Sequence, residues 1–215
     1  MKEYTVEELK REVRVALDQN KSSEPLSALG DIDTLTLDEI IESKLETAAR
    51  MVELSAPYYL LGKGKVLDGG VSWMGRAGEG PGYMALPDDF LRLVTFQMSD
   101  WRRAVTEVIT EDDPRYAMQY SRYPGIKGNP QKPVAAIVKH PMGLVLEFYS
   151  CTAGTGVKIK RATYIPIPKI YGGKISISEK LKPAVVYQSA VLTALTINDT
   201  ASAEKMQEIC NGLKQ

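Results

Sequence analysis

Residues 86–105 read LPDDFLRLVTFQMSDWRRAV, and this stretch decides how the middle of the chain folds. Pro87 with Asp88 and Asp89 is a turn signal, and the apolar, β-branched run after it is typical of a strand. Adjacent residues of an extended segment point to opposite faces, so the two aspartates are poorly placed to share a proton or a metal ion. We therefore expect a turn that opens a strand, which ends near Trp101. Its expected buried residues are Leu91, Leu93, Val94 and Phe96.

Further runs of the same character surround this strand. Four further runs alternate apolar with polar residues or are rich in β-branched residues: AVTEVIT (104–110), PVAAIVKH (133–140), LVLEFYSC (144–151) and VKIKRATYIPIP (157–168). They predict a small antiparallel sheet or barrel. Asp113 followed by Pro114 predicts a short helix with an acidic cap and proline at its first position.

Helical patterns lie toward both ends of the chain. Apolar residues recur every three or four positions in residues 5–19 and again from Thr36 to about Leu54, and each segment begins with capping-box spacing. Ser178 and Thr200 are the expected caps of two C-terminal helices, the last one closed by Asn211-Gly212. The fold class is therefore α+β, with the terminal helices forming a bundle into which an antiparallel sheet or small barrel is inserted.

The same patterns divide the chain into three parts. Residues 1–57 and 178–215 are the expected helical bundle, and 86–177 the β-rich domain with one short helix. Between them, residues 62–82 hold eight glycines in twenty-one positions, too many for a packed helix. Residues 58–85 are therefore expected to be a glycine-rich loop or arm.

Composition restricts the classes of function. The 215 residues hold 27 Lys and Arg against 27 Asp and Glu, which argues against a strong overall positive field for gripping nucleic acid. The first residues are too charged for a signal peptide, and no apolar run approaches the roughly 20 residues needed to cross a bilayer. The expected location is cytoplasmic, without a membrane.

The residue types needed for catalysis or metal binding are sparse. Cys151 and Cys210 have neither the spacing of a zinc site nor that of a disulfide framework. His140 is the only histidine, so a hydrolase would have to pair it with Cys151 or with the acids near Asp113. The glycines at 78–82 do not follow a strand and open a helix, as a nucleotide-binding loop requires. We expect no catalytic residue, no cofactor and no metal.

Two groups of residues are candidates for contact with partners. The glycine-rich segment and the end of the opening stretch contain large apolar and basic residues that we expect to be exposed. These are the candidate interface residues: Trp73, Met74, Arg76, Trp101, Arg102 and Arg103. Lys158 and Lys160 share one face of a strand next to Arg161, so they are candidates to face phosphate or a neighbouring acidic surface.

The order of several segments carries a resemblance. LPDDFLRLVTFQMSDWRRAVTEVI is followed by DDPRYAMQYSRYPGIKGNPQKPVAAI, LVLEFYSC and KISISEKLKPAVVYQSAVLTAL. This order resembles the head-to-tail adaptor (ring or collar) proteins of tailed phages, above all the tail tubular protein A type of short-tailed phages, including crAss-like phages. It covers about two thirds of the chain, from Leu86 to the C-terminus.

The resemblance implies a virion structural protein and no enzymatic activity. It implies a homo-oligomeric ring, expected to be a dodecamer, at the neck of the particle, assembled in the host cytoplasm. Its partners would be the portal protein, other neck or tail proteins, and genomic DNA that passes through the channel without sequence-specific binding. Under this resemblance, Lys158, Lys160 and Arg161 are candidates to face that channel. An intracellular binding module for peptide or nucleic acid is the alternative, and a small hydrolase that uses His140 is a third.

Overall fold

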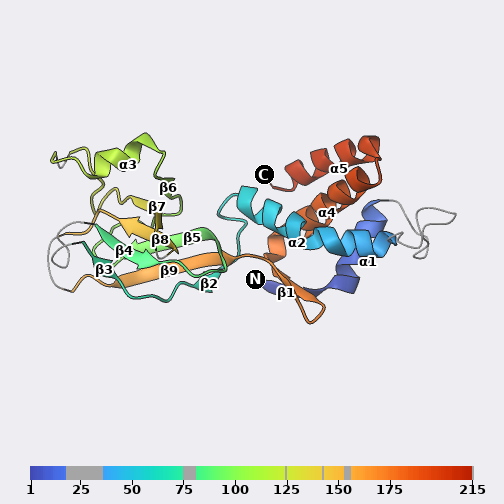
Figure 1. Ribbon diagram of the computed structural model, residues 1–215, viewed down its shortest axis with the longest axis horizontal. Helices are drawn as coiled ribbons and strands as arrows, with labels where there is room; N and C mark the ends of the chain where they lie inside the picture. Colours follow the sequence, from blue (N-terminus) through green and yellow to red (C-terminus); the bar gives the residue numbers. More distant parts are fainter. Residues whose placement is uncertain (18–35, 75–80, 124, 142, 153–155, 215) are drawn as a thin grey trace. The chain divides into compact units, whose positions relative to one another are not determined.

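The computed structural model describes residues 1–17, 36–74, 81–123, 125–141, 143–152 and 156–214. Helices and mainly antiparallel strands confirm the predicted mixed α+β class (Figure 1). The chain divides into two compact units. We call them the helical unit, Met1–Gly62 with Ile167–Gln215, and the sheet unit, Lys63–Pro166.

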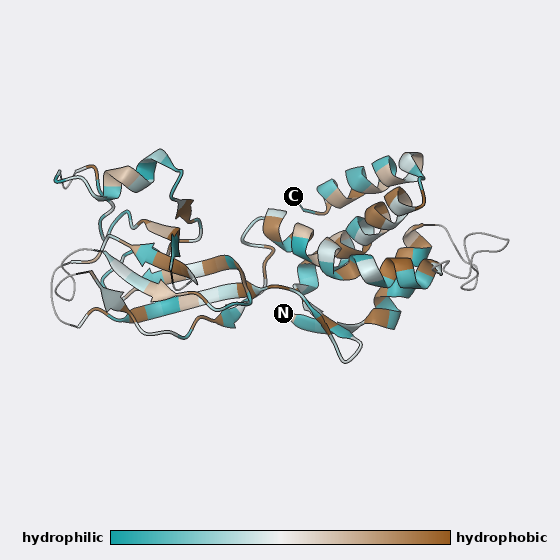
Figure 2. Cartoon of the chain, in the orientation of Figure 1, coloured by the Kyte–Doolittle hydropathy of each residue, from teal (hydrophilic) through white to brown (hydrophobic). Residues whose placement is uncertain are grey.

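The helical unit is built around helix α4 (Lys182–Thr196), which packs against α1 (Val6–Ala16), α2 (Leu37–Ser55) and α5 (Thr200–Gly212). Small residues along α4, such as Ala184, Ser189 and Ala190, are fully buried, and short side chains allow neighbouring helices to approach closely. Hydrophobic and hydrophilic residues alternate around the surrounding helices (Figure 2). Their apolar faces therefore form the core of this unit.

The helix beginnings confirm three predicted caps and correct two others. At the start of α1, the Thr5 hydroxyl accepts a hydrogen bond from the Glu8 N–H at 3.2 Å. The Thr36 side chain accepts a hydrogen bond from the Glu39 N–H, and Glu39 accepts one from the Thr36 N–H, which completes a capping box. Asp113 caps the short helix α3 (Pro114–Gln119), as expected. The last helix is capped by Asp199, not by Thr200, because the Asp199 carboxylate accepts the Ser202 N–H at 3.1 Å.

Ser178 is the other residue for which the predicted cap is wrong. It precedes a single 3-10 turn (Glu179–Leu181), and its hydroxyl makes no capping bond. The hydroxyl instead accepts a hydrogen bond from the Gly62 N–H at 2.5 Å. Helix α4 then begins at Lys182 with Pro183 in its first turn, where a missing N–H costs nothing.

A small sheet also belongs to the helical unit, and it corrects the predicted domain boundary. Strand β11 (Lys174–Ile177) pairs with both β1 (Lys2–Thr5) and β10 (Ile170–Tyr171). Residues 167–177 therefore join the helices and not the β-rich part, because β1 supplies the partner strand from the start of the chain.

The sheet unit contains two sheets (Figure 1). One has the order β2-β9-β5, and the other has the order β3-β4-β8-β7-β6, with β6 and β7 parallel and every other pair antiparallel. One core holds Phe96, Trp101 and Phe148 with the aliphatic residues around them. The strands are β2 Lys65–Val66, β3 Ser72–Trp73, β4 Gly82–Ala85, β5 Phe90–Met98, β6 Ile109–Thr110, β7 Ala135–His140, β8 Gly143–Phe148 and β9 Ile159–Pro166.

The glycine-rich segment is part of this unit in its described residues, which corrects the prediction of a loop or arm over 58–85. It supplies strands β2, β3 and β4. Gly82 packs so closely that a Cβ atom there would lie 2.4 Å from the Phe148 ring. At this position the glycine serves packing and not flexibility.

The opening stretch folds as predicted at its start. The Phe90 N–H donates to the Pro87 carbonyl at 2.9 Å, which closes the turn before β5. Asp89 accepts hydrogen bonds from Lys65 Nζ at 2.9 Å and from the Tyr164 hydroxyl at 2.8 Å, so it ties the turn to β2 and β9. Leu93 and Phe96 are buried. Leu91 and Val94 are only half-buried, since register shifts in the β5–β9 pairing break strict alternation.

Candidate functional site

The predicted interface residues of the glycine-rich segment do not form one exposed patch. Trp73 is half-buried, and its ring meets that of Phe148 edge-to-face at 5.5 Å. Met74 is 52% exposed. Arg76 lies outside the described residues. Of Trp73 and Met74, which the structure describes, only Met74 therefore has a largely exposed apolar side chain.

Trp101 is a core residue, which corrects its place among the predicted contacts. It is 3% exposed, and its ring packs edge-to-face on Phe96 and Phe148. The chain turns after β5, and a hydrogen bond from the Gln97 side chain to the Trp101 carbonyl at 3.0 Å holds the ring inward. The adjacent Arg102 and Arg103 are exposed, as a partner contact requires.

The second basic group lies at the start of strand β9. Lys158, Lys160 and Arg161 are all exposed. Ile159 pairs with Met98 and Arg161 with Gln97, so these cations lie beside the end of β5. Their positions are compatible with phosphate contact.

The hydrolase hypothesis fails for the pair His140 and Cys151. Strands β7 and β8 pair from Ala135 with Phe148 to His140 with Gly143, so His140 lies at one end of the ladder and Cys151 beyond the other. At about 3.4 Å per residue, the two ends are roughly 17 Å apart. Burial raises the pKa of the Cys151 thiol to about 12, and the nearby Asp100 carboxylate acts in the same direction. A nucleophilic cysteine needs a lowered pKa.

Asp113 is also committed to a structural role. Its carboxylate caps α3 through the Arg115 N–H at 2.9 Å and pairs with the Arg115 guanidinium at 2.7 Å. These hydrogen bonds hold the pKa of Asp113 below its usual range. Among the described residues, no group of three or more His, Cys, Asp or Glu side chains is placed to hold a metal ion.

A buried carboxylate surrounded by tyrosines connects α3 to the sheet. Glu147 on β8 is 3% exposed. One of its oxygens accepts hydrogen bonds from the hydroxyls of Tyr116 at 3.3 Å, Tyr120 at 3.1 Å, and Tyr149. Burial raises the pKa of the Tyr120 and Tyr149 hydroxyls, and the Glu147 carboxylate raises both further. The hydroxyls of Tyr120 and Tyr149 therefore remain protonated donors, and the hydrogen bonds from Tyr116 and Tyr120 to Glu147 connect α3 to β8.

A second buried carboxylate lies in the helical unit. Glu53 on α2 is 0% exposed and accepts the Ser178 N–H at 3.1 Å. Burial raises the pKa of Glu53 to about 7, against the opposing effects of the Ser178 N–H and the positive charge of the Met1 amino group. This group therefore titrates near neutral pH.

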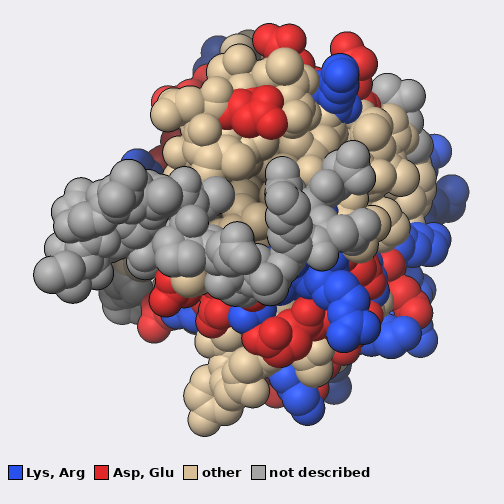
Figure 3. All heavy atoms as spheres, turned by 90° about the vertical axis from the view of Figure 1, so that its right-hand side faces the viewer, with Lys and Arg blue, Asp and Glu red and all other residues tan. Residues whose placement is uncertain are grey.

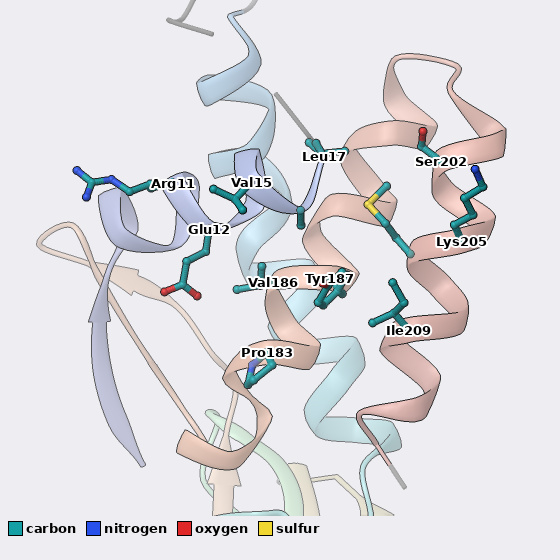
Figure 4. Close-up of a pocket in the computed structure, with 12 residues that line it drawn as sticks. Arg11, Glu12, Val15, Leu17, Pro183, Val186, Tyr187, Ser202, Lys205 and Ile209 are labelled. Atoms are coloured by element: carbon teal, nitrogen blue, oxygen red, sulfur yellow. The ribbon is translucent and has the colours of Figure 1, made fainter. Parts of the chain in front are cut away.

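An open apolar groove lies between three helices of the helical unit (Figure 4). Its volume is about 560 Å³. Val15 comes from α1, Val186 and Tyr187 from α4, and Ile209 from α5. Val15 is 64% exposed and Ile209 45%, so both can be reached from solvent. The groove is a candidate contact surface.

The surface of the helical unit is otherwise mixed in charge. Acidic and basic side chains lie next to one another on the face shown in Figure 3. Lys182 pairs with Glu8 and Glu12 at 2.6 Å each, and Arg14 pairs with Asp38 at 2.6 Å.

The groove and the tyrosine cluster were not predicted from the sequence. The i, i+4 spacing of Tyr116 and Tyr120 was a local signal, but their common partner Glu147 lies 27 residues beyond Tyr120. Met206 and Ile209 on α5 were visible as an apolar pair, whereas Val15 comes from a helix about 190 residues earlier.

The chain matches no known protein family and no curated protein sequence. No helix in the described part of the chain has both the length and the hydrophobicity that crossing a membrane requires.

Proposed function

We propose that this chain is a subunit of a head-to-tail adaptor ring, a non-enzymatic virion protein that joins the portal to the tail of a short-tailed phage. The resemblance that suggests this role follows the order of four segments, and these correspond to β5, α3, β8 and α4. The ring, expected to have twelve copies, surrounds the DNA channel at the neck. Neighbouring copies, the portal and other neck or tail proteins are its partners.

The observation that carries the proposal is the apolar groove between α1, α4 and α5. A subunit of a closed ring contacts its neighbours through two different surfaces, since such an interface repeats head to tail. The buried centre of an interface is apolar with a polar rim. The groove has this composition, because Arg11, Glu12 and Lys205 border its apolar residues.

A peptide-binding module is the competing function, and the same groove supports it. A groove between helices accepts the apolar face of an amphipathic helix. The two functions differ in where the chain is found: a ring subunit is a stoichiometric part of the particle, whereas a peptide-binding module is not.

Mass spectrometry of purified particles tests the proposal. The adaptor function predicts this chain in the particles at a copy number comparable to that of the portal protein. In particles from a virus that carries Ile209→Glu, the chain should be absent, because a charge in the groove opposes the apolar contact. Met51→Glu is the matched control, since Met51 is also 45% exposed and lies on α2 outside the groove. Particles that lack the wild-type chain would refute the adaptor function.

A further inference from the structure

The charge of the chain is unevenly distributed despite its balanced total. From Pro114 to Leu146 the sequence contains no aspartate and no glutamate, although the whole chain has 27 acidic and 27 basic residues. This stretch covers α3, the following loop and most of the β7–β8 hairpin. Its basic residues are Arg115, Arg122, Lys127, Lys132 and Lys139, together with His140.

The loop after α3 has a defined shape next to a cavity. The buried Gln119 side chain accepts the Gly128 N–H at 2.9 Å and donates to the Arg115 carbonyl at 2.9 Å, so it fixes the loop to the helix. A cavity of about 430 Å³ lies between them, and Lys127 and Lys132 line it. The two lysines are therefore held on one concave surface.

Positive charge on this surface is not cancelled by ion pairs within the chain. Arg115 pairs with Asp113, but neither Lys127 nor Lys132 forms an ion pair with any residue that the structure describes. The Arg102 N–H donates to the Pro130 carbonyl at 2.8 Å, which places the exposed Arg102 beside the loop as well. Several cations from two parts of the chain thus lie on one surface.

Exposed aromatic rings lie among these cations. Tyr123 is 56% exposed, and the Arg122 guanidinium lies over its ring at 5.2 Å. Tyr120 is 51% exposed. Cations neutralise phosphates, whereas aromatic rings stack on bases that are free of a duplex, and proteins that bind single strands combine the two. An acidic protein surface would use the cations but has no need of the exposed rings.

We propose that the surface formed by α3, residues 121–123 and residues 125–134 binds single-stranded nucleic acid. Lys127 and Lys132 contact backbone phosphates, and a base stacks on Tyr123. This activity goes beyond the adaptor function, because it requires only one chain and no ring.

Fluorescence anisotropy with a fluorescein-labelled oligothymidylate of 20 nucleotides tests this proposal on the full chain. Between 50 and 200 mM NaCl, the logarithm of the association constant falls linearly with the logarithm of the salt concentration. Each phosphate contact contributes about 0.7 to the steepness of this slope. The double variant K127Q/K132Q should therefore lose about 1.4 of that slope and bind at least tenfold more weakly at 100 mM. Tyr123→Ala should bind roughly fivefold or more weakly with its salt slope unchanged, since it removes stacking only.

The double variant K63Q/K169Q is the matched control, because it removes the same charge from two exposed lysines that lie outside the proposed surface and form no ion pair with any residue that the structure describes. We expect its affinity to stay within about twofold of wild type. Equal weakening of both double variants would overturn the proposal, as would equal affinity for a 20-base-pair duplex. Competition by polyglutamate as effective as that by unlabelled oligothymidylate would instead assign the surface to an acidic protein. None of these results bears on the adaptor function, which is tested by the composition of the particles.

Discussion

Glu53 is expected to contribute a pH-dependent part of the stability of this chain, because it is a buried carboxyl group. Its pKa is raised by burial from 4.5 to about 7, so the folded state holds a proton that the unfolded state has lost between these values. The stability contributed by this group is fully present below about pH 4.5 and is lost as the pH rises through 7. The loss amounts to at most about 3 kcal/mol.

We predict that Glu53→Gln removes this pH dependence, because the amide has nearly the same shape and does not ionise. Thermal unfolding followed from pH 5 to pH 8 should show the wild-type Tm falling relative to that of the variant. Glu204→Gln, which changes an exposed glutamate on α5, should leave the pH dependence intact. The account of Glu53 is wrong if both variants retain the wild-type pH profile.

Tyr149 should be the tyrosine whose hydroxyl matters most for stability. It donates to the buried Glu147 carboxylate, and hydrogen bonds to charged groups contribute about 1.5 to 3 kcal/mol. We expect Tyr149→Phe to lower the free energy of unfolding by about that amount in urea titrations. Tyr171→Phe is the control, because Tyr171 is 90% exposed. Equal stability of the two variants would contradict the role assigned to the cluster.

At the level of elements, local signals predicted helix beginnings only where the capping partner lies within the same few residues. The Thr36–Glu39 box is such a case and was confirmed. Ser178 has the right residue type, but its hydroxyl accepts from Gly62, 116 residues away, which no local pattern reveals. The incorrect prediction for Trp101 has a similar cause. Its polar neighbours in the sequence suggested that it is exposed, whereas packing against the distant Phe148 buries it.

The last helix offers a direct comparison of two adjacent caps. Because the Asp199 carboxylate accepts the Ser202 N–H, Asp199→Ala should lower the Tm by a few degrees. Thr200→Ala should leave the Tm nearly unchanged, since its side chain is not the cap. Differential scanning calorimetry separates the two, and a larger effect from Thr200→Ala would restore the cap predicted from the sequence.

At the level of the whole molecule, we predict that residues 63–166 fold alone. This unit has its own hydrophobic core. Lys65 pairs with Tyr164, so the two ends of the segment lie next to each other, as in a domain that folds by itself. The excised segment should give dispersed amide signals in NMR and a single cooperative unfolding transition. A spectrum typical of an unfolded chain would show that the sheet unit depends on the helices.

The sequence predicted the mixed α+β class, because periodicity and composition are properties of contiguous segments. It did not predict that residues 167–177 join the helices, since this depends on pairing between β1 and β11, which lie about 170 residues apart. Candidate surfaces show the same contrast. The absence of acidic residues from Pro114 to Leu146 could be read directly, whereas the groove requires three helices to meet.

Cryo-electron microscopy of the neck of purified particles tests the adaptor function most directly. The account predicts a closed ring of copies of this chain below the portal, with the groove of α1, α4 and α5 covered by a neighbouring copy or another neck protein. A neck whose density contains no copy of this fold would contradict it.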